Sequence, residues 1–504
     1  MKPTICRTKQ CRAGVPSLRC LAVAAFVFAA LALASGAFAQ AEGTLEAEAE
    51  GPFDAAAESP EELAGDVESN EEAGDDEDWG EFDDWDEEDG GDSGNHSGGR
   101  AWDYQIGGFV EGLIAPRVVR SSASANELVA NEARFRLNVD ATHEIVSVRF
   151  RGDVFADAVD RRIWFDIRDA SIFVRGGSWF SMRFGRQVLT WGTGDFLFLN
   201  DLFPKDFNSF FIGRADEYLK APSNSVQTTF MMKKVGLDLI WTPIFEPDRF
   251  INGQRLSFFN PLIGEIIGDR SPLTPIDPFL PEQRLRNGTV HGRLYGTAGA
   301  VELAAYGYVG YWMQPNAFAL TDPADPNTIL GVTYARLGVY GASLRTPLFG
   351  GLFNVEGAFY DSFKDRAGTT PATPNSQFRG LVGYERELFP KFQMGLQYYL
   401  EYTLKYDELI ASSFWAQYEQ HEFRHLITLR LNQLLVMDKL ELSLFVFFSP
   451  DELDTYIRPR ITYKIVEPLA IVVGANLIFG RNDYTFFGQL QENTNVYARL
   501  RYSF

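Results

Sequence analysis

Long runs in which apolar and polar residues alternate are the feature that most limits how this chain can fold. In residues 392–406 every even position is apolar or aromatic, and the odd positions are polar or glycine apart from Tyr399. Side chains two residues apart lie on the same face of a β-strand, so this run predicts a strand with two unlike faces. At 15 residues it is long for a strand of a soluble domain.

The same alternation recurs along the chain, with arginines gathered on the polar face. It is clear in four further segments, 129–142, 146–154, 422–432 and 457–465. A soluble β-sandwich or propeller needs shorter strands and does not point arginines from one face of many strands. A membrane barrel has both properties, because lipid surrounds its outer face and water fills its interior. After residue 40 no apolar run reaches about 18 residues, which argues against membrane-spanning helices.

The sequence therefore predicts an all-β fold, a transmembrane antiparallel β-barrel of about 18 strands, with a range of about 16 to 20. The expected strands are 103–116, 129–142, 144–156, 164–175, 178–189, 223–233, 236–248, 288–297, 300–313, 331–346, 351–363, 377–387, 392–406, 422–433, 439–449, 455–465, 469–480 and 493–504. An even count places both ends of the barrel on the periplasmic side. The connections alternate between short turns and longer loops, as expected of periplasmic turns and external loops.

Residues 1–39 have the pattern of a secretory signal peptide. Five basic residues precede or flank a long apolar stretch, which ends at the small-residue cleavage motif Ala37-Phe38-Ala39. All three cysteines, Cys6, Cys11 and Cys20, fall in this segment. The mature chain is therefore expected to have no disulfide, no thiol catalysis and no cysteine-bound metal.

Residues 40–100 are predicted to be a disordered acidic arm in the periplasm. The formal net charge of the whole chain is −22, but residues 41–100 hold 24 acidic residues and one arginine. Residues 101–504 hold 44 acidic and 40 basic residues, so the barrel region is nearly neutral. The arm has too few large apolar groups to fold alone. Trp79, Phe82 and Trp85 punctuate it, so it is either a solvated tail or a segment that binds a basic periplasmic partner.

One segment resembles a known group of proteins. The sequence "FGRQVLTWGTGDFLFLNDLFPKDF", followed by "DEYLKAPSNSV", is similar to a porin-like family of large, mostly uncharacterised Gram-negative outer-membrane barrels. The matching positions are Gly185, Arg186, Gln187, Trp191, Gly192, Asn200, Asp201, Pro204, Asp206, Glu217, Leu219, Lys220 and Pro222. Gly-Arg-Gln also occurs in barrels that export exopolysaccharide, so it does not separate import from export. The resemblance implies outer-membrane transport, with no catalytic residue and no settled substrate.

The resemblance to porins also gives an expectation for residues 190–222, the third external loop on this strand count. In porins this loop often folds inward and narrows the lumen. Its acids are Asp195, Asp201, Asp206, Asp216 and Glu217, and the arginines assigned inward on strands two to five are Arg134, Arg136, Arg149, Arg151, Arg168 and Arg183. Opposed charges across a constriction would orient and select solutes. Alternatively, these arginines pair with Asp140, Asp153 and Asp166 within the wall, or the phenylalanine-rich loop forms a plug.

The last strand, 493–504, is expected to close the barrel. Leu500, Tyr502 and Phe504 share the lipid-facing parity, while Arg499 and Arg501 face the lumen. As the resemblance to porins implies, the terminal Phe504 is expected to be read by the barrel assembly machinery.

The motif "HEFRH", His421 to His425, matches a zinc metalloprotease signature. That chemistry needs both histidines on one helical turn, but the following residues alternate with period two. On a strand the two histidines would lie roughly 13 Å apart, too far to bind one zinc ion. The segment is therefore predicted to start a strand, with no metal, cofactor or catalytic site and no nucleic-acid signature.

Taken together, the sequence predicts a porin-like channel of the outer membrane for passive passage of small solutes. Its partners are outer-membrane lipid, the assembly machinery and, in one interpretation, further copies of itself. The first alternative is the outer-membrane barrel of an export system for polysaccharide or lipid, and a minor alternative is a hydrolase embedded in the barrel.

Overall fold

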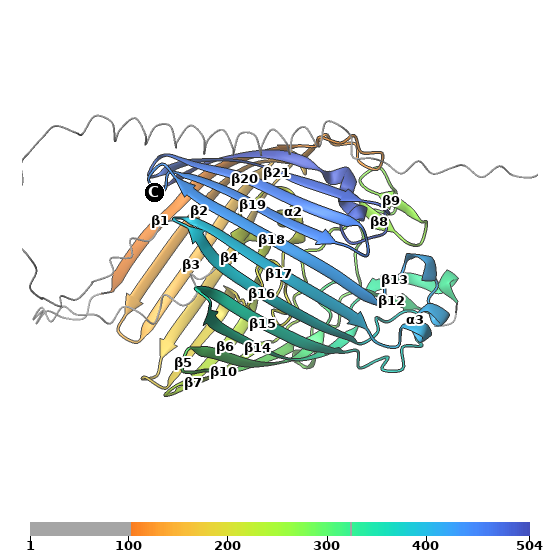
Figure 1. Ribbon diagram of the computed structural model, residues 1–504, viewed down its shortest axis with the longest axis horizontal. Coiled ribbons are helices and arrows are strands. Elements are labelled where there is room, and N and C mark those ends of the chain that lie inside the picture. Colours follow the sequence, from red (N-terminus) through yellow and green to blue (C-terminus); the bar gives the residue numbers. More distant parts are fainter. Residues whose placement is uncertain (1–101, 323–324) are drawn as a thin grey trace, which may run out of the picture. The chain divides into compact units, whose positions relative to one another are not determined.

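Eighteen strands of the chain pair in one closed ring in the computed structural model, which describes residues 102–322 and 325–504 (Figure 1). The predicted signal peptide, 1–39, and the acidic arm, 40–100, lie outside the described residues. The strands of the ring are β1 (Asp103–Pro116), β2 (Leu128–His143), β3 (Val146–Asp157), β4 (Arg162–Arg175), β5 (Phe180–Val188), β6 (Pro222–Met232), β7 (Val235–Thr242), β10 (Thr289–Ala298), β11 (Val301–Tyr311), β14 (Arg336–Leu348), β15 (Gly351–Asp361), β16 (Gln377–Phe389), β17 (Phe392–Thr403), β18 (Phe423–Leu435), β19 (Leu440–Ser449), β20 (Asp454–Val466), β21 (Leu469–Gly480) and β22 (Asn495–Ser503).

Every strand of the ring pairs antiparallel with the strands before and after it in the ring. The ring closes between β1 and β22, where Val110 lies opposite Tyr502. At the end of this seam the backbone groups of Gly108 and Phe504 exchange two hydrogen bonds of 2.9 Å. The prediction of an antiparallel barrel with 18 strands is confirmed.

The two faces of the ring differ as the alternation predicts. On β17 the side chains of Leu396 and Tyr398 are 48% and 42% exposed, whereas Gln397, Tyr399 and Glu401 are buried on the inner side. Apolar groups therefore cover the outer face, which is the arrangement that a bilayer requires of a barrel. Among the described residues, no helix has the length and apolar character needed to cross a bilayer.

Aromatic side chains mark both ends of the apolar outer face. Near the short turns, Trp179, Phe180 and Phe230 pack together with ring centroids 5.5 to 6.3 Å apart. Near the long loops, Tyr402 and Phe423 stack with centroids 4.7 Å apart. Rings at these two levels form the interfacial girdles typical of outer-membrane barrels.

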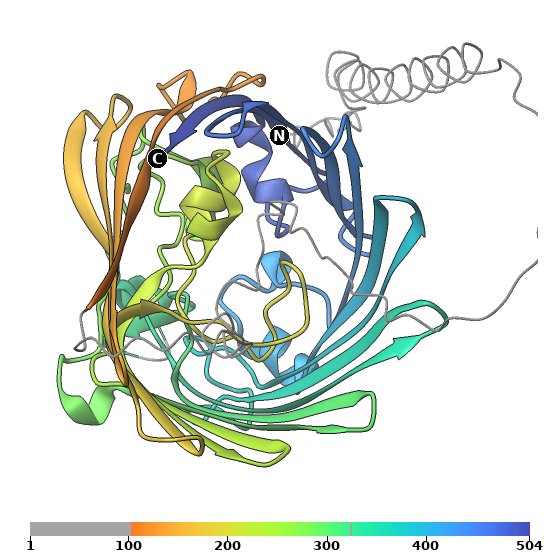
Figure 2. The ribbon, with the colours of Figure 1, turned by 90° about the vertical axis from the view of Figure 1, so that its left-hand side faces the viewer.

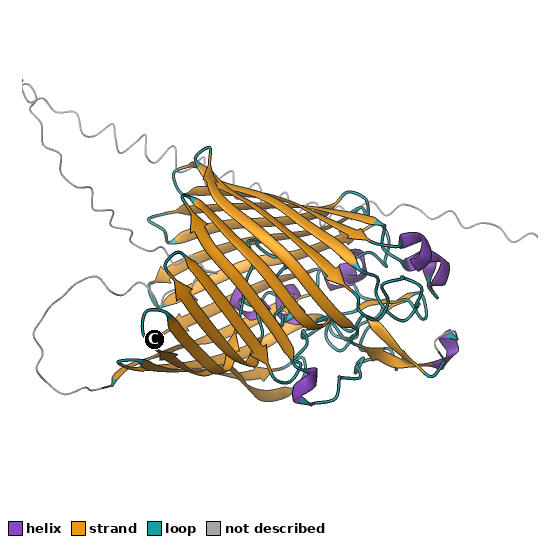
Figure 3. Cartoon of the chain, turned by 90° about the horizontal axis from the view of Figure 1, so that it is seen from below, coloured by secondary structure: helices purple, strands orange, loops and turns teal. Residues whose placement is uncertain are grey.

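Short turns lie at one end of the strands, with the C-terminus, and the long loops gather at the other (Figures 1 and 3). The long loops contain the short strands β8 (Phe258–Asn260), β9 (Glu265–Ile267), β12 (Ala317–Leu320) and β13 (Ile329–Thr333). They also hold the helices α2 (Phe207–Phe211) and α3 (Tyr406–Ser412) and the 3-10 turns η2 (Asp216–Leu219), η3 (Leu285–Asn287), η4 (Pro326–Thr328), η5 (Ala416–Tyr418) and η6 (Gly488–Asn493).

Two strand boundaries differ clearly from the sequence prediction. The strand expected over 236–248 ends at Thr242 in β7, because Pro243 and Pro247 lack the N–H that a ladder needs. The strand expected over 331–346 begins only at Arg336. Residues Ile329–Thr333 have the composition of a strand but pair with β12 in a separate hairpin.

Gly185 on β5 has a backbone conformation that other residues rarely adopt. Its φ is +127°, and a Cβ there would collide with the carbonyl oxygen of Ala170 on β4. We expect Gly185→Ala to destabilise the barrel by about 1–3 kcal/mol. The measurement is the urea midpoint for loss of the compact, heat-modifiable band on gels. Gly112→Ala is the matched control, since a Cβ at Gly112 meets nothing within 4 Å. Equal midpoints for the two variants would contradict the prediction.

Candidate functional site: a loop that crosses the lumen

The segment between β5 and β6, residues 189–221, lies inside the ring of strands (Figure 2). We call it the lumen loop. It contains α2 and η2, which follow each other along its return path. The carboxylate of Asp206 caps α2 by accepting a 2.9 Å hydrogen bond from the backbone N–H of Ser209.

The outgoing part of the lumen loop is attached to β15. The carboxylate of Glu356 accepts hydrogen bonds of 2.8 to 3.0 Å from the backbone N–H and hydroxyl of Thr193 and from the backbone and side-chain N–H groups of Asn200. The Tyr360 hydroxyl donates to the carbonyl of Leu199 at 2.5 Å. Gly192, at φ +98°, passes close to the same carboxylate. The loop therefore spans the lumen from β5 to β15.

The return part is held by Tyr218, which is 1% exposed. Its ring lies under the guanidinium groups of Arg134, Arg136 and Arg168, at 3.7, 4.9 and 4.5 Å from the ring centroid. Its hydroxyl donates to Asp153 at 2.7 Å and accepts from Arg136 at 2.5 Å. Several cation–π contacts in a desolvated site add to the stability of the attachment.

Arg168 holds the backbone of the same return part. It donates to the carbonyls of Glu217 and Lys220, both at 2.8 Å. In the β3–β4 ladder, Arg151 lies opposite Asp169 and Gly152 opposite Ile167, so Arg168 occupies a β-bulge. A bulge redirects a side chain away from the regular alternation.

Two acids of the loop form ion pairs with wall arginines. Glu217 lies 2.7 Å from Arg136 on β2 and 3.3 Å from Arg501 on β22. Asp216 lies 2.5 Å from Arg458 and 3.1 Å from Arg460, both on β20. Burial alone would raise the pKa of each carboxyl, but the neighbouring arginines hold both pKa values below the usual range. These contacts fix the loop to the wall at two further places.

The other three acids predicted as site residues have different partners. Asp195 lies 3.4 Å from Arg430 on β18, although burial raises the pKa of Asp195. Asp201 is buried, and its carboxylate forms an ion pair with the ammonium group of Lys205 within the loop, at 2.8 Å. Asp206, besides capping α2, lies 3.5 Å from Arg249.

The remaining predicted arginines lie on the inner face of β3 and β5, away from the return part of the loop. Arg149 pairs with Asp140 on β2 at 3.0 Å. Arg151 lies opposite Asp169 in the ladder. Arg183 lies over the ring of Phe173, 5.7 Å from its centroid. The structure thus brings Arg134, Arg136 and Arg168 to the loop and leaves these three on the wall.

Five of the residues that carry the family resemblance lie where the lumen loop leaves the wall. Gln187 is fully buried and donates to the Ser225 hydroxyl at 2.9 Å. Trp191 packs edge-on against Phe203, with centroids 5.1 Å apart. Together with Gly185, Gly192 and Arg186, which donates to the carbonyl of Ile167 at 2.8 Å, they form the base of the loop.

Sequence reasoning missed Glu356, Tyr360 and Tyr218 as parts of this site. Parity alone places Glu356 on the inner face of its strand, but many other inward residues share that signal. Tyr218 follows Asp216 and Glu217 directly, so the charged return "DEYLK" is the one local signal that marks it.

Asp248 connects the loop after β7 to the lumen loop, because its carboxylate accepts a 2.8 Å hydrogen bond from the backbone N–H of Lys205. Burial raises its pKa to about 7, with Lys205 opposing the rise. The folded protein therefore retains a proton that the unfolded chain loses from about pH 4 upward, so stability falls as pH rises from about 4 to about 7.

We expect Asp248→Asn to reduce this fall in unfolding free energy by at least about 1 kcal/mol. The measurement compares urea unfolding of both proteins between these pH values. Replacement of Asp103 by Asn is the control, since this residue is exposed on β1 and lies outside the lumen loop. A parallel pH course for Asp248→Asn and the native protein would show that this carboxyl does not titrate as proposed.

The "HEFRH" segment has no helix, since β18 begins at Phe423. His425 instead lies within 2.7 Å of the Tyr398 hydroxyl on the neighbouring strand. Within the described ranges there is no cluster of three or more His, Cys, Asp or Glu side chains placed to hold a metal ion.

Comparison with solved structures finds matches that cover about four fifths of this chain. OccD3 (OpdP) of Pseudomonas aeruginosa is similar with a TM-score of 0.47 and 10% identity, over 80% of this chain and 91% of that chain. OccK11 (OpdR) of the same organism has a TM-score of 0.44 and 11% identity, over 79% and 95%. The outer membrane channel DcaP of Acinetobacter baumannii has a TM-score of 0.39 and 10% identity, over 80% and 97%. No family model and no curated protein sequence matches the chain.

Proposed function

We propose that this protein is a porin-like channel of the outer membrane that lets small solutes pass by diffusion. The observation that carries the proposal is the closed ring of 18 strands, apolar on its outer face and rich in arginine and acidic side chains within. A barrel with this polarity is stable with lipid outside and water inside. The outer membrane is therefore the proposed location.

The lumen loop is proposed to narrow the passage and to select among solutes. Its acids Asp216 and Glu217 are neutralised by direct contact with arginines. Arg149, Arg151 and Arg183 lie on the wall nearer the periplasmic turns, where Arg149 pairs with Asp140 and Arg151 lies opposite Asp169. We infer a preference for anions, because arginines lie along the inner wall and cationic groups in a lumen with low-dielectric walls raise the local concentration of anions.

Two other functions stay as alternatives. The barrel of an export system would also have a polar lumen, but it is expected to stay closed until a partner opens it. A hydrolase would need a catalytic site, and the "HEFRH" segment leads into strand β18 at Phe423 and does not form the helix that zinc proteases use.

Electrical recording from the purified full-length protein in a planar bilayer tests the proposal. We expect open, ohmic channels and, in asymmetric salt, a reversal potential of the sign given by anions. The same protein after heat unfolding is the control. A channel that stays closed would contradict passive diffusion and favour the exporter. A cation-selective reversal potential would contradict the role given to the arginines.

A further inference from the structure

The wall of the barrel has a short seam between β4 and β5. The ladder between them runs only from Arg175 opposite Ser181 to Ala170 opposite Arg186. On the other side of β4, pairing with β3 continues to Arg162. The half of β4 nearer the long loops thus extends past the last paired residue of β5. Side chains of β5 and of the loops, Arg186 and Arg249, contact it there.

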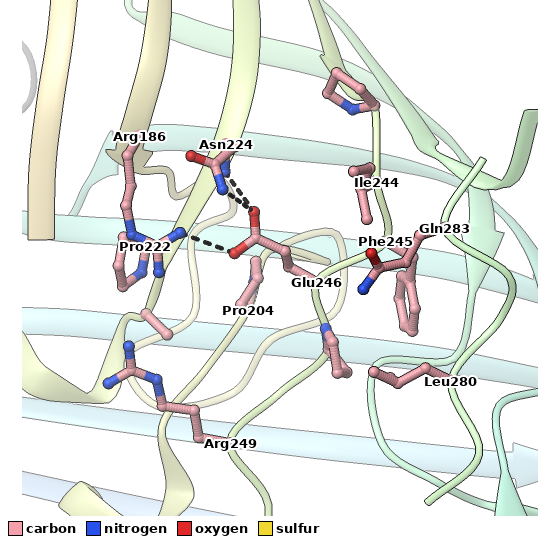
Figure 4. A pocket seen from close by; sticks show the side chains of 13 residues that line it. Arg186, Pro204, Pro222, Asn224, Ile244, Phe245, Glu246, Arg249, Leu280 and Gln283 are labelled. Atoms are coloured by element: carbon pink, nitrogen blue, oxygen red, sulfur yellow. Dashed lines mark hydrogen bonds and ion pairs between the residues drawn. The ribbon is translucent and has the colours of Figure 1, made fainter. Parts of the chain in front are cut away.

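A cavity of about 550 Å³ lies at the upper end of this seam (Figure 4). It is lined by Arg186 and Asn224 from β5 and β6, by Ile244, Phe245 and Glu246 after β7, and by Leu280. Arg186 shares the parity of Phe184, and Asn224 that of Phe230, on the outer face. Ile244 and Leu280 are 43% and 51% exposed. The inner side of the cavity is formed by Pro204 and Ala221 of the lumen loop, and the cavity opens toward the outer side, which Arg186 and Asn224 face.

Its height places it beside the outer leaflet. Asn224 is six residues from Phe230 of the lower aromatic girdle, roughly 20 Å along the strand. The apolar band of a barrel is about 25 Å tall and the strands are tilted, so the cavity lies at or below the upper interface. Polar side chains facing lipid at this level are costly and commonly mark function.

The polar end of the cavity is a carboxylate site. Three donors surround the carboxylate of Glu246: the guanidinium of Arg186 at 3.0 Å, and the backbone and side-chain N–H groups of Asn224 at 2.7 and 2.8 Å (Figure 4). Glu246 belongs to the loop after β7 and not to a strand of the wall. Ile244, Phe245 and Leu280 form an apolar surface next to it.

We propose that this cavity binds a single-chain amphiphile with a carboxylate head, taken from the outer leaflet. The head replaces the Glu246 carboxylate on Arg186 and Asn224, and the chain lies on the apolar surface. Pockets that bind ligands have volumes of about 300–1,000 Å³. A cavity of about 550 Å³ therefore suits an amphiphile with one chain and not a lipid with several chains.

The proposal predicts opposite effects for two neighbouring substitutions. Arg186→Gln removes the charged donor and should weaken binding several-fold, because charge-assisted hydrogen bonds are the strong ones. Glu246→Gln removes the competing carboxylate and should strengthen binding several-fold. Arg386→Gln is the matched control, since Arg386 is exposed on β16, away from the cavity.

The probe is a diazirine analogue of palmitate, added to the full-length protein in an uncharged detergent. We expect saturable labelling of the peptides that contain Ile244 and Leu280, competed by palmitate but not by hexadecanol. Heat-modifiable migration checks that each variant is folded. If Arg186→Gln does not fold, the rise expected for Glu246→Gln still decides the question.

Unsaturable labelling, or equal labelling of Glu246→Gln and the native protein, would overturn the proposal. Equal competition by hexadecanol would show that the cavity selects apolar chains alone, and stronger competition by an alkyl phosphate would show that the head is not a carboxylate. Either result also overturns it.

Discussion

Replacing the lumen loop by a short turn is expected to raise the single-channel conductance several-fold. Val188 and Pro222 lie opposite each other in the β5–β6 ladder, so a short Gly/Ser turn can join Leu189 to Ala221 without moving either strand. The loop lies inside the ring and reaches β15 through Glu356, so its removal clears space across the lumen. Conductance follows the cross-section of the aqueous path.

The control shortens another external loop in the same way. Residues 362–376 connect β15 and β16, and Tyr360 lies opposite Gln377 there. We expect the conductance of this variant to stay near the native value. An unchanged conductance without the lumen loop would show that ions pass by a route that the loop does not narrow.

Replacing Arg149, Arg151 and Arg183 together by glutamine is expected to lower the anion-to-cation permeability ratio several-fold. These arginines lie on the inner faces of β3 and β5, the two strands that flank β4, within a few residues of the periplasmic turns. In a lumen with low-dielectric walls, fixed charges set the local ion concentration. Removing three positive charges therefore reduces the attraction for anions there.

The measurement is the reversal potential in asymmetric potassium chloride, and the shift should shrink at high salt because of screening. The triple variant Arg284→Gln, Arg286→Gln and Arg386→Gln is the control, with an equal loss of charge at exposed positions. An equal shift in both triple variants would assign the selectivity to net charge and not to the lumen.

The barrel fold can be predicted from the sequence because every strand that faces lipid must place apolar residues on its outer face. Outward residues such as Leu396 must be apolar, and inward ones such as Gln397 need not be, so strand identity and number follow from local alternation. Strand ends are less certain. The residues after Thr242 keep an apolar character, but they leave the wall to reach the lumen loop and Met313.

Contacts across the lumen could not be predicted from the alternation of the sequence. Parity assigns Glu356 and Arg430 to the inner face, yet it says nothing about which residue of the lumen loop each one meets. Asp195 pairs with Arg430, more than 200 residues away in the chain, and not with the arginines of β2 to β5. The position of a loop depends on side-chain packing between segments far apart in sequence, which no local period records.

The seam between Gly108 and Phe504 also has a consequence for how the protein folds. Arg501 and Glu111, which pair beside it, are separated by 390 positions in the chain. Contacts of such separation carry the largest loop-closure entropy, so this seam is expected to form last and slowly. Until then β1 and β22 each present an unpaired edge that can associate with another chain. The interval before closure is thus the stage of folding at which this protein most needs protection from aggregation.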